Sequence, residues 1–96
     1  MYILITYDVD TISEMGQKRL RQVARICKDY GQRVQNSIFE SEVTESQYVK
    51  LKDALSVVID KSLDSIRFYH LNKNENRRVA TIGRETSYHV NDVIIL

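Results

Sequence analysis

The sequence predicts an α+β domain in which two helices cover one face of a β-sheet. Two amphipathic stripes with helical spacing alternate with segments rich in Ile, Val, Tyr and Phe, which are typical of strands. The chain has 96 residues, of which 43% are hydrophobic and 28% charged. This composition indicates an ordered protein with one modest core, so we expect a single domain over residues 1–96.

The first predicted strand covers residues 1–7, and both of its faces are largely apolar, which favours a central position in the sheet. A helix is predicted next, with Thr11 and Ser13 as candidate N-caps and Gly31 as the C-terminal stop. Thr11 and Glu14 have the spacing of a capping box. The apolar stripe of this helix consists of Leu20, Val23, Ala24, Cys27 and Tyr30.

The segment "RVQNSIFESEV", which follows Gly31, leaves the strand order open. Its apolar anchors are Val34, Ile38 and Phe39. If the segment bends or splits, the element order is β-α-β-β-α-β; if it stays one strand, the order is β-α-β-α-β-β. A second capping box, Thr44 with Gln47, follows directly, and on sequence alone it favours the single strand.

The remaining elements follow from the same two periodicities. A second helix carries an apolar stripe of Tyr48, Leu51, Leu55 and Val58. The segments "SIRFYHL" and "RRVATIG" are predicted strands, separated by the polar turn "NKNEN". A sheet with two helices keeps one bare face, and the chain ends in the apolar run "DVIIL". We therefore expect this tail to bury against a second copy of the chain.

Charge and composition limit the compartment and the partners. The net charge is +1, so overall charge predicts no nucleic-acid partner and any such partner depends on local patches. The single cysteine, Cys27, cannot form an intramolecular disulfide, which fits a reducing cytoplasm. No apolar run is long enough for a membrane span, and the first residues lack the pattern of a signal peptide. We expect a cytoplasmic protein with no membrane partner.

Two carboxylates, Asp8 and Asp10, follow the first strand. Acidic residues at such positions commonly serve as turn or cap residues, and this is the assignment that we favour for Asp10. For Asp8 the alternative is a metal ligand, because Mg²⁺ needs only one or two carboxylates and keeps several waters. One Asp in each chain makes a poor site, whereas two copies of Asp8 across a twofold axis make a better one.

A row of cations follows one face of the first helix, with no acid between its first and last members. Its members are Lys18, Arg21, Arg25 and Lys28, and Arg19 adds a fifth positive charge. A solvated helix face is the usual origin of such a run. Contact with nucleic-acid phosphates is the functional alternative, since phosphates favour closely spaced cations without neighbouring carboxylates.

The strand predicted after Gly31 has one mostly polar face. On a regular strand this face consists of Arg33, Gln35, Ser37 and Phe39. Three polar residues and one aromatic make a poor core face. We expect either an exposed strand face or a polar surface that lines a site or an interface.

Three segments, "LITYDV", "KRLRQVARICKDYGQRVQNSIFE" and "DSIRFYHL", resemble the CRISPR-associated Cas-two family. The resemblance covers nearly the whole chain, and it is most specific at the strand end Tyr7–Asp8 and in the block from Gly31 to Glu40. It implies a ferredoxin-like β-α-β-β-α-β fold with an extra C-terminal strand, and a homodimer. Residues 92–96 would form that strand and pack on the partner protomer.

The resemblance also implies a function in CRISPR adaptation, the acquisition of new spacers. In this family the dimer bridges Cas-one integrase dimers and helps to hold a fragment of double-stranded DNA, the protospacer. Many members are also described as metal-dependent endonucleases that cut RNA or double-stranded DNA. Asp8 corresponds to the family's catalytic metal ligand, and the implied cofactor is Mg²⁺ or Mn²⁺. The metal would polarise the phosphate and help to generate hydroxide from water.

The sequence shows no evident general base and no second pair of metal ligands. The alternative function is therefore a scaffold that binds DNA and bridges Cas-one without chemistry of its own. In both functions the expected nucleic-acid contacts are Lys18, Arg19, Arg21, Arg25, Lys28 and Arg33. The residues expected to line the site around Asp8 are Tyr7, Asp10, Gln35, Ser37 and Phe39.

Overall fold

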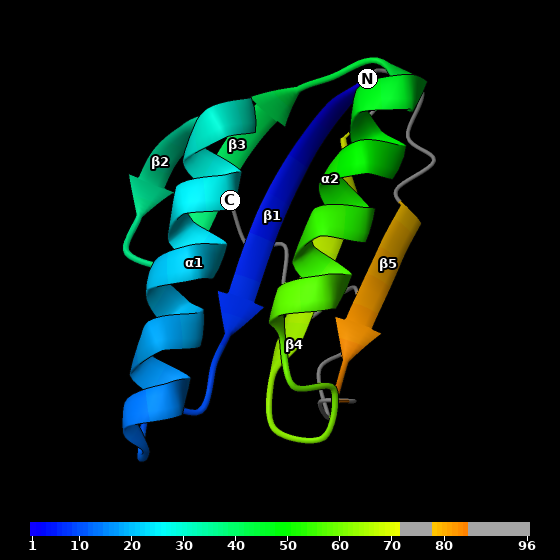
Figure 1. The fold of residues 1–96 in the computed structure, drawn as a ribbon. Helices are drawn as coiled ribbons and strands as arrows, with labels where there is room; N and C mark the ends of the chain where they lie inside the picture. Colours follow the sequence, from blue (N-terminus) through cyan, green and yellow to red (C-terminus); the bar gives the residue numbers. More distant parts are fainter. Residues whose placement is uncertain (72–77, 85–96) are drawn as a thin grey trace.

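The computed structural model describes residues 1–71 and 78–84 and shows one antiparallel sheet with two helices on one face (Figure 1). In chain order the elements are β1 (Tyr2–Asp8), α1 (Glu14–Tyr30), β2 (Gln32–Gln35), β3 (Ile38–Glu42), α2 (Glu45–Val58), β4 (Ser65–His70) and β5 (Arg78–Gly83). The strands lie in the order β2-β3-β1-β4-β5. The predicted α+β, ferredoxin-like fold is thus confirmed, with β5 added beside β4. The predicted strand at 92–96 lies outside the described residues.

The segment between the two helices forms two strands, so the single strand that the sequence favoured is wrong. A turn at Asn36 and Ser37 separates β2 from β3, and the pairing of the two strands shifts between Arg33 and Gln35. Asn and Ser are good turn residues because their side chains bond to nearby backbone. The Thr44 capping box fixes where α2 begins, but it does not constrain whether the preceding segment folds back on itself.

β1 is the central strand of the sheet, as its two apolar faces predicted. It pairs with β3 on one side and with β4 on the other, and its last residue, Asp8, lies opposite Ser65. Side chains alternate between the two faces of a strand. Ile3, Ile5 and Tyr7 point into the core and are buried, whereas Asp8 is exposed.

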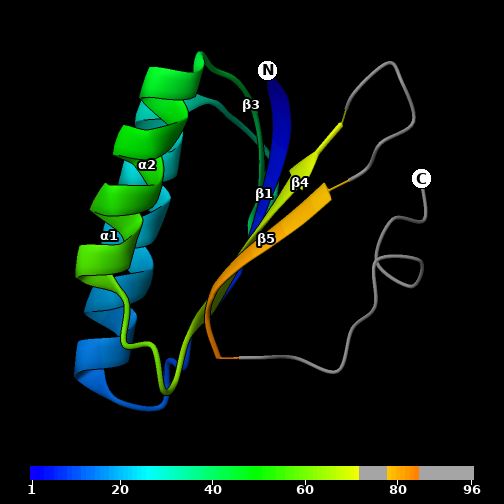
Figure 2. The same cartoon turned by 90° about the vertical axis from the view of Figure 1, so that its right-hand side faces the viewer.

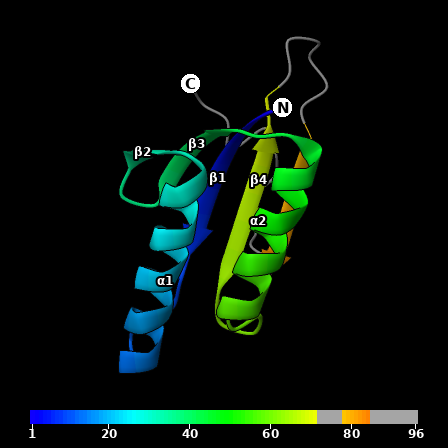
Figure 3. The same cartoon turned by 45° about the horizontal axis from the view of Figure 1, so that its top comes forward.

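The core lies between the sheet and the two helices. Figure 2 shows α1 and α2 on the same side of the sheet, and Figure 3 shows them side by side across it. The fully buried residues of the core are Ile3, Ile5, Val23, Cys27, Phe39, Leu51, Leu55, Ile66 and Phe68. Neither described helix covers the opposite face of the sheet. Neither one has the combination of length and apolarity that a membrane span needs.

Ser13, one of the two candidate caps, begins α1. Its hydroxyl accepts a hydrogen bond from the backbone N–H of Gly16 at 3.0 Å, and the capping box predicted between Thr11 and Glu14 is not formed. A Cβ atom at Gly16 would lie 1.8 Å from the carbonyl oxygen of Asp10. The loop after β1 therefore packs directly against the first turn of α1, and this contact requires glycine.

The capping box predicted at the start of α2 is present. The Thr44 hydroxyl accepts a hydrogen bond from the N–H of Gln47 at 3.1 Å, and the Gln47 side chain accepts one from the N–H of Thr44 at 2.9 Å. We expect Thr44→Ala to lower the free energy of unfolding by about 1 kcal/mol, measured by urea denaturation. Ser46→Ala in the same turn is the control, because the Ser46 hydroxyl bonds to none of the described residues. Equal stability of the two variants would contradict the capping role.

Candidate functional site

Asp8 lies where three strands meet at one end of the sheet. It ends β1, Ser65 begins β4 beside it, and Gly83 ends β5 beside Ser65. The Asp8 side chain is 68% exposed. By strand alternation it shares a face with Thr6 and Leu4, which is the face opposite the helices. The carboxylate is thus open to solvent on the side of the sheet that α1 and α2 leave uncovered.

The Asp8 carboxylate forms an ion pair with Arg84, with 3.0 Å between Oδ2 and Nη2. The backbone fixes the position of Arg84, because its N–H donates a hydrogen bond to the carbonyl oxygen of Asp64 at 2.7 Å. Gly83, just before it, has a φ of 102°, and a Cβ atom there would lie 2.2 Å from the same carbonyl oxygen. Only glycine fits this turn, which brings Arg84 beside Asp8.

A buried carboxylate, Asp64, holds this end of the sheet together. Its side chain is fully buried and accepts hydrogen bonds from Arg19 Nε at 2.7 Å, from the Asp60 N–H at 2.9 Å and from the Asp10 N–H at 3.0 Å. Burial raises the pKa of Asp64. The hydrogen bonds from Arg19 and from the two backbone N–H groups together lower it by more than burial raises it, so the pKa lies below its ordinary value. One side chain thus ties together the loop after β1, helix α1 and the loop before β4.

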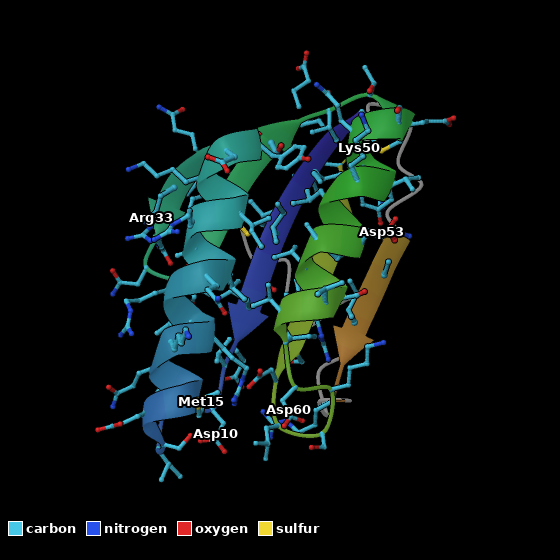
Figure 4. All side chains as sticks on the ribbon, viewed as in Figure 1. Asp10, Met15, Arg33, Lys50, Asp53 and Asp60 are labelled. Atoms are coloured by element: carbon cyan, nitrogen blue, oxygen red, sulfur yellow. The ribbon has the colours of Figure 1, made fainter. Side chains whose placement is uncertain are left out.

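Two residues that the sequence assigned to the site or to nucleic acid belong to this network. The guanidinium of Arg19 is engaged with Asp64 and its side chain is only 13% exposed, so Arg19 is a structural residue in this conformation. Asp10 donates its N–H to Asp64, and its carboxylate accepts a hydrogen bond from the N–H of Ile12 at 3.1 Å. This is the turn role favoured for Asp10. Figure 4 shows Asp10 and Asp60 at the same end of the molecule.

Four exposed cations remain on α1, and we name them the α1 ridge: Lys18, Arg21, Arg25 and Lys28. None of them forms an ion pair with a residue in the described part of the chain. Arg33 extends the positive charge beyond the end of α1, where its guanidinium lies 5.2 Å from the centre of the Phe39 ring (Figure 4). Lys28, Arg33 and Phe39 line a shallow groove there. This surface presents closely spaced cations to solvent, as a phosphate backbone requires.

The other predicted site residues do not form one surface around Asp8. Tyr7 and Phe39 are buried under α1, where their rings stack with centroids 6.1 Å apart. The Tyr7 hydroxyl donates a hydrogen bond to the Asn36 carbonyl oxygen at 3.1 Å. The turn before β3 breaks the predicted strand face, which leaves Gln35 exposed in β2 and Ser37 in the turn.

Asp64 and Arg84 were not identified from the sequence. Asp64 precedes the predicted strand "SIRFYHL", and Arg84 follows the Gly that ends "RRVATIG". An acid at one strand end and a cation at another do signal a charged cluster if the strands are adjacent. The antiparallel order of β1, β4 and β5 supplies that adjacency, and only the tertiary structure shows it.

The Asp8 carboxylate is a type of ligand that a hard divalent cation prefers, although the described residues provide few such ligands. Within residues 1–71 and 78–84, no three or more His, Cys, Asp and Glu side chains gather at one point. Mg²⁺ is commonly held by one or two carboxylates, with waters and substrate phosphates completing the shell. An exposed carboxylate with solvent around it meets that requirement.

The fold and the site define a small ferredoxin-like protein with an exposed carboxylate at the end of its central strand and a basic helix. The chain belongs to the family of the CRISPR associated protein Cas2, whose family model matches residues 1–79. This confirms the resemblance that the sequence showed.

Individual relatives match over nearly their full length. The chain is 50% identical over 94 residues to the CRISPR-associated endoribonuclease Cas2 3 of Rhodospirillum rubrum, which covers 98% of this chain and 99% of the relative. It is 48% identical over 95 residues to the CRISPR-associated endonuclease Cas2 of Halalkalibacterium halodurans, with 99% of each chain covered. The crystal structure of Streptococcus pyogenes Cas2 at pH 6.5 matches with a TM-score of 0.72 and 57% identity, over 77% of this chain and 89% of that one.

Proposed function

We propose that this protein is a metal-dependent endonuclease of CRISPR adaptation that acts as a homodimer on the phosphodiester bonds of DNA or RNA. The observation that carries the proposal is Asp8, a 68% exposed carboxylate at the end of the central strand. Relatives that are 50% and 48% identical carry the names endoribonuclease and endonuclease, which supports the same reaction class. The test compares Mg²⁺-dependent cleavage by the wild-type protein and by Asp8→Asn.

In this mechanism Asp8 and the Asp8 of a second copy would hold Mg²⁺ or Mn²⁺. When bound, the cation supplies charge stabilisation to the phosphate and acidifies water. The residues of this chain position and expose the carboxylate. The Asp64 network fixes the end of β1, and the small residues Ser65 and Gly83 next to Asp8 leave the edge of the sheet open to a phosphodiester.

The same geometry supports a homodimer. Among residues 1–71 and 78–84 no three metal-ligating side chains gather at one point, and Asp8 lies on the sheet face that the described helices leave open. Two copies that meet through this face would bring two Asp8 side chains together. Two adjacent carboxylates repel each other, and a divalent cation between them relieves that repulsion.

The α1 ridge favours a second function, a scaffold that binds protospacer DNA and bridges Cas-one integrase dimers without cleaving. The supporting observation is the exposure of Lys18, Arg21, Arg25 and Lys28 without ion-pair partners among the residues that the structure describes. Such a scaffold needs the cations but not the Asp8 carboxylate. The two functions can therefore be distinguished by substitution. Replacing Asp8 should remove cleavage, whereas replacing the cations of the α1 ridge should weaken DNA binding.

DNA binding through the α1 ridge should depend on salt and largely ignore base sequence. Each phosphate that a cation neutralises releases counterions, so the logarithm of the affinity falls linearly with the logarithm of the salt concentration, by about 0.9 per phosphate. We expect the double variant Arg21→Ala/Arg25→Ala to bind duplex DNA more weakly and to flatten this slope by about 0.9 for each phosphate that it no longer neutralises. Fluorescence anisotropy over a salt series measures both quantities.

The control removes the same charge from another surface. Lys50 and Lys61 are exposed and lie outside α1, so Lys50→Ala/Lys61→Ala lowers the net charge equally. Its slope should stay close to that of the wild type. If both double variants flatten the slope by the same amount, overall charge and not the α1 ridge determines binding.

A further inference from the structure

The backbone positions the ion pair between Asp8 and Arg84, although the two side chains are largely exposed, at 68% for Asp8 and 48% for Arg84. Exposed ion pairs contribute little to stability, so stability does not explain it. The pair joins the end of β1 to the residue after β5, across β4. The left-handed turn at Gly83 and the hydrogen bond from the Arg84 N–H to Asp64 both serve to place this guanidinium.

Arg84 is also the described cation that contacts Asp8. Of the other arginines near this end, Arg19 is engaged with Asp64, and Arg67, which lies opposite Thr6 on β4, is buried. The α1 ridge lies on the helix layer, which covers the opposite face of the sheet (Figure 2). Only one nitrogen of Arg84, Nη2, bonds to Asp8. A guanidinium carries five N–H donors in a planar fork that matches a phosphate in bidentate geometry. Most of the donor capacity of Arg84 is therefore not used by the ion pair.

We propose that Arg84 is the phosphate-binding residue of the Asp8 site. Without metal, Arg84 pairs with the Asp8 carboxylate. When a divalent cation binds that carboxylate, the Arg84 guanidinium is released and binds the phosphodiester. This inference rests on the proposed function in one respect, namely that Asp8 is the metal ligand.

The physical reason is competition between two cations for one carboxylate. Nη2 lies 3.0 Å from Oδ2, so a divalent cation that binds there must displace the guanidinium or lose part of its attraction to Asp8. Displacement frees a charged group that is anchored by its backbone and cannot move far. A nearby phosphodiester offers it a new partner. Metal and nucleic acid should thus each favour the binding of the other, by the same factor.

The experiment measures binding, so it does not depend on turnover. The full-length wild type, Arg84→Ala, Arg84→Lys and Asp8→Asn are titrated with Mn²⁺ alone, followed by electron paramagnetic resonance. Binding of a labelled oligonucleotide is then measured with Ca²⁺ and with chelator, and a gel confirms that the oligonucleotide stays intact. Lys50→Ala is the charge-matched control, since Lys50 is exposed at the other end of the molecule (Figure 4).

We expect Arg84→Ala to bind Mn²⁺ about two- to fivefold more tightly than the wild type, the range that an exposed ion pair allows. The same variant should lose the gain in oligonucleotide affinity that Ca²⁺ gives the wild type. Arg84→Lys should keep Mn²⁺ affinity near the wild type but lose part of that gain, because an ammonium cannot form the bidentate contact. Lys50→Ala should match the wild type in both measurements.

The outcomes separate this inference from the proposed function. If Arg84→Ala binds Mn²⁺ no more tightly than the wild type, or keeps the full gain in oligonucleotide affinity, Arg84 is not the phosphate-binding residue. If Asp8→Asn binds Mn²⁺ as the wild type does, the metal-ligand role of Asp8 fails, and the inference fails with it. Loss of Mn²⁺ binding in Asp8→Asn alone, with Arg84→Ala unchanged, would overturn only the inference.

Discussion

Asp8→Asn is expected to fold and to bind DNA as the wild type does but to lose Mg²⁺-dependent cleavage, by about 100-fold or more. Asparagine keeps the shape of the side chain and removes the charge that holds the metal. Asp8 is 68% exposed and lies outside the core, so the change in unfolding free energy should stay within about 0.5 kcal/mol. Cleavage of a labelled duplex and a labelled RNA, with Mg²⁺ or with chelator, measures the effect.

The matched control is Asp53→Asn, the same chemical change at an exposed position on α2 (Figure 4). It should cleave as the wild type does. Equal cleavage by the wild type and Asp8→Asn would contradict the metal-ligand role and indicate a contaminating nuclease. If neither protein cleaves while DNA binding is intact, the scaffold function is favoured instead.

Asp64→Ala is expected to be the most destabilising single change at this end of the molecule, at about 3 kcal/mol. It leaves Arg19 and the backbone N–H groups of Asp10 and Asp60 without their acceptor. The value lies at the lower end of the range for broken buried pairs, because Arg19 keeps some contact with water. Urea denaturation at neutral pH measures it. Asp53→Ala should change the unfolding free energy by less than about 0.5 kcal/mol, and a comparable value for Asp64→Ala would contradict the structural role.

The pH dependence of stability provides a second test of Asp64. The hydrogen bonds from Arg19 and the backbone hold its folded-state pKa below the unfolded-state value of about 3.9, although burial alone would raise it. The contribution of Asp64 is therefore present above about pH 4 and is lost as the pH falls through the folded-state pKa. Below about pH 4 the unfolding free energy of the wild type should fall more steeply than that of Asp64→Ala. Parallel pH curves for the two proteins would show that Asp64 does not titrate in this way.

The sequence predicted those parts of the fold that depend on neighbouring residues. The Thr44 capping box, the stop at Gly31 and the central position of β1 all follow from local spacing, and the structure confirms them. On sequence alone the split between β2 and β3 was the less favoured alternative, because the Thr44 capping box favoured one strand and the apolar anchors on both sides of Asn36 fit the pattern of one strand. A two-residue turn leaves too little signal to outweigh that pattern.

In the candidate site, too, the sequence predicted what depends on local pattern and not what depends on contacts between distant segments. Asp8 stands out in the sequence because it directly follows an apolar strand, whereas its partner Arg84 is 76 residues away. The acid-free run from Lys18 to Lys28 grouped Arg19 with the other cations of α1, but it cannot show that the Arg19 guanidinium reaches a buried acid 45 residues away. Likewise the strand pattern could not show that Tyr7 and Phe39 stack in the core. Contacts between distant segments depend on strand order, which local patterns do not determine.

The central position of β1 also affects the order in which the protein can fold. β1 comes first in the chain, yet its two neighbours begin only at Ile38 and at Ser65. Both ladders of β1 therefore require the closure of long loops, whereas β2 and β3 pair across a short turn. During synthesis Ile3 and Ile5 stay in water until β3 has emerged, and β1 gains its second neighbour only with β4. The nascent chain thus exposes at least one edge of its most apolar strand until β4 has emerged, a period in which it is open to association with other chains.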